Sequence, residues 1–508
     1  MSHSNFELNF ATRRKLGYEL IDVINEYFES LATRPVQAPV EQRSFEPLHD
    51  SMPETGILDE QSVTPCSNGN SGDKLAGFLR GTAAQMIDRG FHVAAANYFG
   101  LMNPTPTYAG FLAEALVAAL NPQLATTARS QLASKIEAET VRWIGERFDW
   151  QQPFGGTFTS GGNEANFSAL ALALATHFPD AVEDGIASLG AQPMVYASEE
   201  SHHSLDKSVG LLGLGRKALH RIELNEQCSM DVSALERAIA ADRLAGKKPF
   251  CVVATAGTTN SGIIDDILGI ADVCEREGLW LHLDGAYGAA VTLSDAYRHL
   301  VRGIERCDSV TIDPHKWLAV PFVAGVVMTR RPEAMYAAFG VSTPYMPKPV
   351  PGVPLDNFKV STQWTRRMNS FKLWLTLKLH GRIAYQVLID DQMQLAREFA
   401  AWVESSEAFE LATPQVLPIL NLRLKHAGDG DQLAQRHMEL VDRVTGDGRR
   451  WISETRVAGK SVIRIMIVSY LTTRSHLQEL QEELMGVTKM PLSRGAELGS
   501  GERGRRIR

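Results

Sequence analysis

The sequence is poor in cysteine, and this scarcity excludes two classes of protein. It has 5 cysteines in 508 residues, without the paired spacing of a zinc site. A small secreted domain held by disulfides would need many more bridges per residue. We therefore expect free thiols in a reducing compartment. The five are Cys66, Cys228, Cys251, Cys274 and Cys307.

Long hydrophobic runs are also lacking. A transmembrane helix needs about 18 apolar residues in a row, and no such run is present. The most apolar stretch, residues 310–328, contains Asp313, His315 and Lys316. The first ten residues, MSHSNFELNF, show no basic region followed by an apolar one, so they predict no secretory signal. These features predict a cytoplasmic protein without a membrane partner.

The chain has no excess of positive charge. Its net charge is -8 at pH 7, and its pI is about 6.0, so nothing indicates a nucleic-acid partner. The one basic run, residues 494–508, has five arginines against two glutamates among several glycines. We expect a disordered basic tail over residues 491–508.

Short apolar runs alternate with helical patterns through the middle of the chain. Because the runs are rich in β-branched residues and mostly do not alternate with polar ones, they indicate strands buried on both faces. Such an order predicts an α/β fold with a mainly parallel sheet flanked by helices. The predicted strands are 193–198, 250–257, 279–285, 309–314 and 324–330, and helices between them include 231–246 and 265–278.

The domain prediction follows from the flanking segments. Residues 8–31 form an amphipathic helix whose apolar side another subunit can cover, so 1–105 is predicted as a helical dimerisation segment. Residues 106–380 form the large domain, and 381–490 form a smaller α+β domain. Residues 340–360 contain five prolines and are predicted to form a functional loop. In the predicted helix 130–148, Ser134 and Glu137 have capping-box spacing.

Lys316 follows a predicted strand, within the segment TIDPHKW. A buried lysine is costly unless it is paired or chemically used. One such use is an imine with an aldehyde cofactor, and the alternative is a lysine that reaches the solvent.

Asp284 ends the predicted strand LWLHLD and precedes the small residues GAYGAA. An acid in this place suits the pyridine nitrogen of pyridoxal 5'-phosphate (PLP), which must stay protonated. An N-cap is the alternative for Asp284 alone. Asp284 and Lys316 are 32 positions apart, one strand-helix-strand step. Both are therefore expected at the sheet edge where ligands bind in open α/β folds.

Three further segments follow strands or begin helices. Residues 160–166, SGGNEAN, precede an apolar helical run, so their glycines expose N–H groups to an anion, although such a loop is often only a turn. His202 follows a strand and would stack on the cofactor ring. The adjacent histidines His202 and His203 suggest a metal site as an alternative. No other ligands are spaced to complete such a site, so no metal is predicted. Thr255, Thr258 and Thr259 either bond the cofactor or cap a helix.

In this order, the segments resemble the group II PLP-dependent amino-acid decarboxylases. That family includes aromatic-L-amino-acid, histidine, glutamate and cysteine sulfinate decarboxylases. The resemblance runs from about residue 8 to about residue 486. It is carried by SGGNEAN, SEESHHS, ATAGTT, HLDGAYG, DPHKW and SFKLWLTLKLHG.

The resemblance implies a fold-type-I enzyme that forms a homodimer with its active site at the subunit interface. It implies that Lys316 is the Schiff-base lysine and Asp284 the pyridinium partner, with Ala286 below the ring and His202 above it. Tyr345 matches a loop tyrosine that protonates the substrate carbon, and Arg464 matches an arginine near the substrate. The other implied cofactor contacts are Thr259 and the phosphate ligands Gly161, Gly162, Asn163 and His315.

The sequence departs from the family pattern in three places. Asp313 replaces a common asparagine, and Gly161 and Asn163 replace serines of the aromatic-amino-acid decarboxylases. Residues 121–131 align with a pocket-lining loop but lack the large apolar side chains that an aromatic substrate favours. The sequence therefore does not name the amino acid.

The implied reaction converts an L-amino acid to its amine and carbon dioxide. An aldehyde synthase, a lyase or an aminotransferase on the same fold stays open, as does a catalytically silent scaffold. Because aldehyde synthases alter the loop tyrosine or the stacking histidine, the presence of Tyr345 and His202 favours simple decarboxylation.

Overall fold

The computed structural model describes residues 8–40, 70–342, 356–428 and 430–489. Tyr345, Cys66 and most of the proline-rich loop lie outside these ranges, as does the predicted tail. Within the described ranges, no helix is both long and apolar enough to cross a bilayer.

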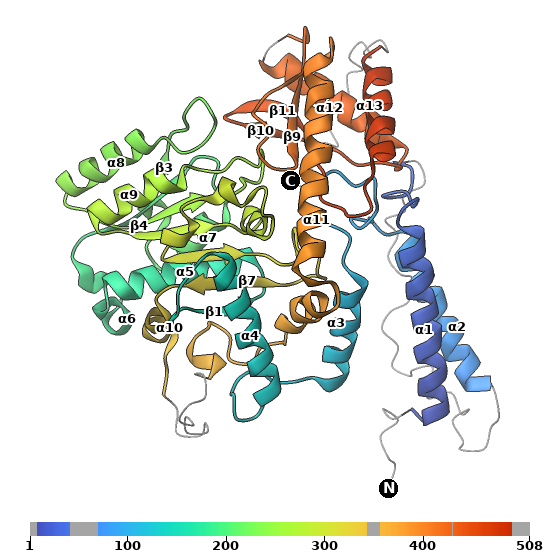
Figure 1. The fold of residues 1–508 in the computed structure, drawn as a ribbon, viewed down its shortest axis with the longest axis horizontal. Coiled ribbons are helices and arrows are strands. Elements are labelled where there is room, and N and C mark those ends of the chain that lie inside the picture. The colour runs from blue at the N-terminus through green and yellow to red at the C-terminus, as the bar shows by residue number, and fades with distance from the viewer. Residues whose placement is uncertain (1–7, 41–69, 343–355, 429, 490–508) are drawn as a thin grey trace, which may run out of the picture.

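A seven-stranded sheet forms the centre of the large domain (Figure 1). Its order is β1-β7-β6-β5-β4-β2-β3, and only β7 runs antiparallel to its neighbours. The predicted, mainly parallel sheet is confirmed. The strands are β1 (Gly155–Thr159), β2 (Pro193–Ser198), β3 (Leu219–Ile222), β4 (Lys248–Thr255), β5 (Trp280–Asp284), β6 (Ser309–Ile312) and β7 (Gly325–Thr329).

Helices bury both faces of this sheet. One apolar cluster joins the sheet to α4 (Gln131–Arg147), α8 (Val232–Leu244) and α9 (Ile267–Glu277). A second cluster joins it to α5 (Gly162–His177), α7 (Ser204–Leu211) and α10 (Pro332–Phe339). Along β4, Val252 and Ala254 belong to the first cluster and Cys251 and Val253 to the second, as the two-residue strand period requires.

The small domain has its own sheet and core. Its antiparallel strands lie in the order β10-β11-β9-β8, and its apolar cluster includes residues of α12 (Gly430–Gly446) and α13 (Arg474–Thr488). The long helix α11 (Ser370–Ser405) links the two domains, with a non-helical backbone at Gly381. The four strands are β8 (Phe409–Leu411), β9 (Ile419–Leu424), β10 (Ser453–Val457) and β11 (Lys460–Met466).

The remaining helices lie outside the two sheets. Helix α1 (Phe10–Ser30) packs along α2 (Asn70–Asp88), and the pair projects from the molecule (Figure 1). Helix α3 (Tyr108–Leu120) packs against α11, and the short α6 (Asp180–Asp184) follows α5.

Two local details differ from the sequence predictions. Strands β1 and β3 were not predicted, because β1 begins with two glycines and β3 has only four residues. The capping box was also wrong, since Ser134 lies inside α4 and Ser130 is its N-cap position. Glu137 instead forms a buried ion pair with Arg366, at 2.6 Å.

Candidate active site at the edge of the large sheet

Lys316 lies in the turn after β6, at the carboxyl end of that strand. Its Nζ is 3.2 Å from Asp313 Oδ2, and the lysine side chain is 25% exposed. Its backbone N–H donates to the carbonyl of Asp313, at 2.9 Å. The amine is therefore held near a carboxylate while a small molecule can still reach it.

Asp284 closes β5, next to β6 in the sheet. Its side chain is buried, and its two oxygens each accept one hydrogen bond. Asn166 Nδ2 donates to Oδ2 at 2.7 Å, and the N–H of Ala286 donates to Oδ1 at 3.2 Å. A carboxylate has about four lone-pair sites, so capacity remains for a further donor.

His282 lies two residues before Asp284, on the same side of β5. Its Nε2 is 3.1 Å from Asn166 Oδ1, and its Nδ1 is 2.9 Å from Ser309 Oγ. Burial lowers the pKa of His282 to about 4, although the charge of Asp284 opposes this. The ring is therefore neutral at pH 7. The sequence did not predict the contacts of Asn166 and His282 with each other and with Asp284. It did contain signals for both positions, since Asn166 ends the SGGNEAN segment and His282 lies on the same side of β5 as Asp284.

Glycines allow three turns to meet beside Lys316. Gly161, at the N-cap of α5, has a φ of 136°, which only glycine adopts readily. A Cβ on Gly162 would lie 2.7 Å from Asp313 Oδ2 and 3.4 Å from Ala286 Cβ. The first turn of α5 thus directs its free N–H groups toward the region of Asp313 and His315. Asn163 lies exposed in that turn.

Glu164 fixes this turn in place, which sequence reasoning missed. It accepts hydrogen bonds from the N–H of Ser160 at 2.7 Å and from Gln363 Nε2 at 2.6 Å. Burial raises its pKa, but the hydrogen bonds from Thr362, Ser160 and Gln363 outweigh burial and lower it overall. A charged Glu164 therefore ties the glycine turn to the segment before α11.

His202 lies in the turn after β2 and is exposed. Its Nδ1 accepts the N–H of Ser204, at 3.1 Å, which leaves Nε2 for a ligand. Partial desolvation lowers the pKa of His202, and the charges of Asp284 and Lys316 act on it in opposite directions. His202 is therefore placed close to both predicted catalytic groups.

Thr259 and Arg464 meet where the large and small domains touch. Arg464 Nη1 donates to the carbonyl of Thr259 at 3.1 Å and to Asn260 Oδ1 at 3.3 Å. Arg464 is buried, and desolvation lowers its pKa to about 10, so it stays charged at pH 7. Across the described ranges, no group of three or more histidines, cysteines or acids is placed to hold a metal ion.

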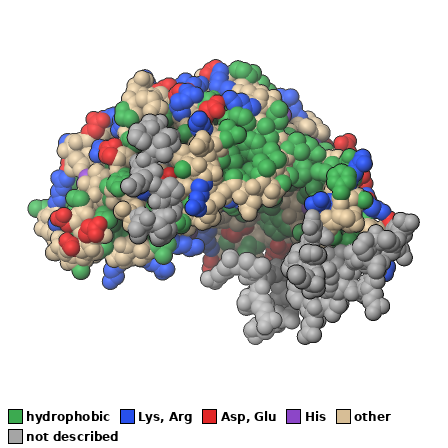
Figure 2. Space-filling model, turned by 90° about the horizontal axis from the view of Figure 1, so that it is seen from below, with side chains coloured by type: hydrophobic (Ala, Val, Ile, Leu, Met, Phe, Trp, Pro, Cys, Tyr) green, Lys and Arg blue, Asp and Glu red, His purple; other side chains and the backbone are tan. Residues whose placement is uncertain are grey.

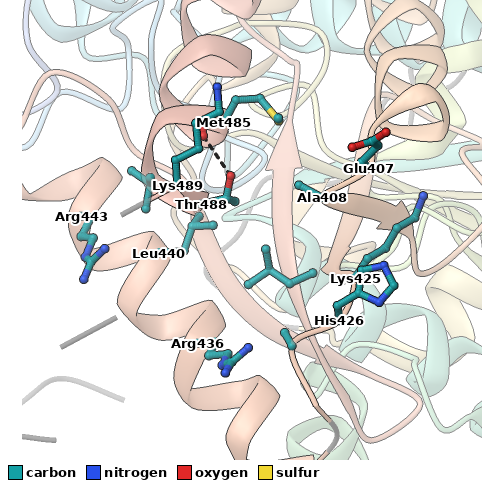
Figure 3. Close-up of a pocket in the computed structure, with 13 residues that line it drawn as sticks. Glu407, Ala408, Lys425, His426, Arg436, Leu440, Arg443, Met485, Thr488 and Lys489 are labelled. Carbon is teal, nitrogen blue, oxygen red and sulfur yellow. Dashed lines mark hydrogen bonds between the residues drawn. The ribbon is translucent and has the colours of Figure 1, made fainter. Parts of the chain in front are cut away.

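A separate cavity of about 330 Å³ lies in the small domain (Figure 3). Its lining includes Lys425 and His426 after β9, Arg436 on α12, and Met485 and Lys489 at the end of α13. No residue predicted to touch the cofactor lines this cavity. The candidate active site is therefore the edge of the large sheet.

The residues at that edge fit PLP. A buried carboxylate closes one strand, a reachable lysine follows the neighbouring strand, and a glycine turn begins a helix beside them. These are the groups needed for a pyridinium nitrogen, an aldehyde and a phosphate. The fold and this set of groups define an α/β enzyme that uses PLP.

Comparison with known proteins gives the family. Residues 69–425 match the family described as "Pyridoxal-dependent decarboxylase conserved domain". The chain is 30% identical over 490 residues to an aromatic-L-amino-acid decarboxylase of Bacillus atrophaeus, covering 96% of this chain and 97% of the relative. It is 29% identical over 390 residues to an L-2,4-diaminobutyrate decarboxylase of Acinetobacter baumannii, covering 74% and 76%.

A solved structure agrees on the fold. The crystal structure of Oryza sativa TDC with PLP and tryptamine has a TM-score of 0.83 and 24% identity, covering 96% of this chain and 99% of that one. The chain belongs to the pyridoxal-dependent decarboxylase family. Its cofactor is PLP, and it is a carboxy-lyase that acts on an amino acid.

Proposed function

We propose that this enzyme decarboxylates an L-amino acid at the edge formed by β5 and β6, with Lys316 as the lysine that binds PLP. One observation carries the assignment. Asp284 is the last residue of β5, and Lys316 follows the neighbouring parallel strand β6. Asp284 is buried, Lys316 can be reached from solvent, and the glycine turn of α5 lies beside them. No other described lysine combines this exposure with a buried carboxylate and that turn.

Each residue then has a task defined by its position. When bound, PLP would supply the electron sink for the electron pair that stays on the substrate Cα as carbon dioxide leaves. Asp284 holds a proton at the pyridine nitrogen, and Asn166 keeps the carboxylate oriented at 2.7 Å. His202, whose Nδ1 accepts the N–H of Ser204, would stack on one face of the cofactor ring, and the small side chain of Ala286 would leave room on the other face.

The first turn of α5 is the proposed binding site for the cofactor phosphate. The N–H groups of Gly161, Gly162 and Asn163 lie at the positive end of that helix, with the ring of His315 beside them. Burial lowers the pKa of His315, so it serves as a neutral hydrogen-bonding group. Thr259 and Arg464 close the side of the site that faces the small domain.

Tyr345 is the residue proposed to return a proton to the substrate carbon.

The direct test is carbon dioxide release from PLP-loaded enzyme with each common amino acid. Lys316→Ala should abolish release and the visible band of bound cofactor. Lys217→Ala removes an exposed lysine that is distant in sequence from Lys316, and it should change neither carbon dioxide release nor the visible band. Release that persists in Lys316→Ala would refute the assignment of this lysine. Cofactor binding without release from any amino acid would favour another reaction on this fold.

We also propose a homodimer with the active site at the subunit interface. Support comes from two exposed apolar stripes with a spacing of four residues, on α3 and α11, which pack side by side. Hydrophobic side chains also gather in a broad area on one face of the molecule (Figure 2). Exposed apolar patches of this kind mark interaction sites. The stripes are Tyr108, Leu112, Leu116 and Leu120, and Leu379, Ile383 and Val387.

The pair α1–α2 is the proposed dimerisation segment within 1–105, since Phe10, Tyr18 and Phe78 are exposed on it. We further propose a cytoplasmic location, supported by four described cysteines that are all free.

A further inference from the structure

The side chain of Asp313 is buried beside Lys316 with an unused oxygen. It is 2% exposed, and Oδ2 lies 3.2 Å from Lys316 Nζ and 3.8 Å from His315 Nε2. The other oxygen, Oδ1, is buried and has no hydrogen-bond partner among the described residues. Leaving a buried carboxylate oxygen without a donor is costly, so the position calls for a functional explanation.

The carboxylate lies against the first turn of α5. A Cβ on Gly162 would come within 2.7 Å of Oδ2 and 3.3 Å of the Asp313 carboxyl carbon. The backbone of Asp313 is also held beside this turn, because its N–H donates to the carbonyl of Ala286 at 3.0 Å. The Asp313 carboxylate therefore lies at the same helix end that is proposed to hold the cofactor phosphate.

The charges around Asp313 favour an anion there. Lys316 is the cation in contact with it, and the helix N-terminus adds partial positive charge. His315 is a weaker contributor, since burial lowers its pKa and favours the neutral ring. An arriving phosphate brings a second anion to a site that already holds one.

We propose that Asp313 sets the affinity for the cofactor phosphate: its carboxylate neutralises the positive end of α5 in the empty site and repels the phosphate when PLP binds. The inference rests on the proposed function, since it takes Lys316 and the α5 turn as the PLP site. An asparagine of the same shape would remove the charge and supply an N–H donor to the phosphate.

The test compares PLP with pyridoxal, which lacks the phosphate. Apo-protein is titrated with each compound, and the dissociation constants of wild type and Asp313→Asn are measured by absorbance. We expect PLP to bind about tenfold more tightly to Asp313→Asn, since a like-charge contact becomes a hydrogen bond. Pyridoxal affinity should change less than about twofold, because it brings no phosphate. Asp295→Asn, an exposed acid, is the matched control and should leave both constants unchanged.

Inorganic phosphate gives a second measurement that needs no bond to Lys316. Its own inhibition constant, corrected for the PLP affinity of each protein, should be about tenfold lower in Asp313→Asn than in wild type. If Asp313→Asn does not fold, Asp313→Ser tests the same loss of charge.

Unchanged or weaker PLP binding by the folded variants would overturn the proposal. Equal tightening of PLP and pyridoxal would also overturn it, since the carboxylate would then act on Lys316 and not on the phosphate. Failure of the proposed function is distinguishable, because in that case Lys316→Ala would keep the visible band whatever Asp313 does.

Discussion

At the scale of single residues, Asn166 holds the Asp284 carboxylate in place through a hydrogen bond. Its amide lies between three partners: Asp284 Oδ2 at 2.7 Å, Ser204 Oγ at 3.1 Å and His282 Nε2 at 3.1 Å. Because all four groups are buried, each hydrogen bond replaces water that cannot enter. Asn166 is therefore a positioning residue for Asp284, the acid proposed to meet the pyridine nitrogen.

We predict that Asn166→Ala lowers the free energy of unfolding by about 2 kcal/mol, since it leaves buried partners without their hydrogen bonds. Urea unfolding measures this loss. Ser204→Ala keeps the bond between Asn166 and Asp284, so it should cost less, about 1 kcal/mol. Equal losses of unfolding free energy in the two variants would show that the hydrogen bond to Asp284 adds no stability beyond that of the bond to Ser204.

His282 makes the folded protein sensitive to acid. Its folded pKa of about 4 is below the ordinary histidine value of 6.5, so the unfolded chain takes up a proton that the folded protein refuses. Its contribution is complete above pH 6.5 and declines as the pH falls toward 4. Between pH 7.5 and pH 5 we predict a loss of about 2 kcal/mol from this group.

Urea unfolding at several pH values checks this slope. His282→Gln should flatten it, while His203→Gln, which removes an exposed imidazole, should leave it as in wild type. His437, with a pKa also of about 4, keeps part of the slope in both variants. A slope that His282→Gln does not change would contradict the prediction.

At the scale of elements, the hairpin β10–β11 is tied to the turns that carry the site. Asn260, after β4, donates to Glu200 Oε2 at 3.2 Å and accepts from Thr455 Oγ1 at 3.0 Å. Glu200, after β2, accepts the N–H of Ala458 at 2.9 Å. The small domain thus holds the turns of His202 and Thr259 through polar contacts at the hairpin.

We predict that Asn260→Ala loosens this contact. The peptide 453–466 should exchange its amide hydrogens faster, and KM should rise by about tenfold, since Arg464 loses a partner beside the site. Hydrogen exchange and steady-state kinetics provide the two readouts. Arg456→Ala changes an exposed residue of the same hairpin and is the matched control. Unchanged exchange in Asn260→Ala would show that the hairpin is held by other contacts.

At the scale of the whole molecule, the exposed stripes of α3 and α11 predict the behaviour of surface variants. Leu116→Glu places a charge in the proposed interface, where desolvation is costly. We expect the variant to sediment with half the mass of wild type. Leu244→Glu changes a leucine of α8 that is 91% exposed and should sediment like wild type. A wild-type protein that sediments as a monomer would refute the homodimer.

The sequence predicted much of the site because strand ends are visible in a linear chain. Asp284 and Lys316 each follow an apolar run, and the glycines of the α5 turn precede another, so their common edge follows from the parallel order. Asn166, His282 and Glu164 were missed because their roles depend on partners from distant segments. The separation of Asn166 from Asp284 is 118 residues, and periodicity carries no such information.

By itself, the sequence determined the α/β fold, the family motifs and the order of the segments proposed to bind the cofactor, because strand and helix periods and turn residues act locally. Only the tertiary structure decided that Asp313 faces the α5 turn with an unpaired oxygen, and that Glu137 pairs with Arg366 instead of capping α4. The reason is physical: burial and charge pairing arise when segments from different parts of the chain are packed together, and these interactions set how a carboxylate behaves.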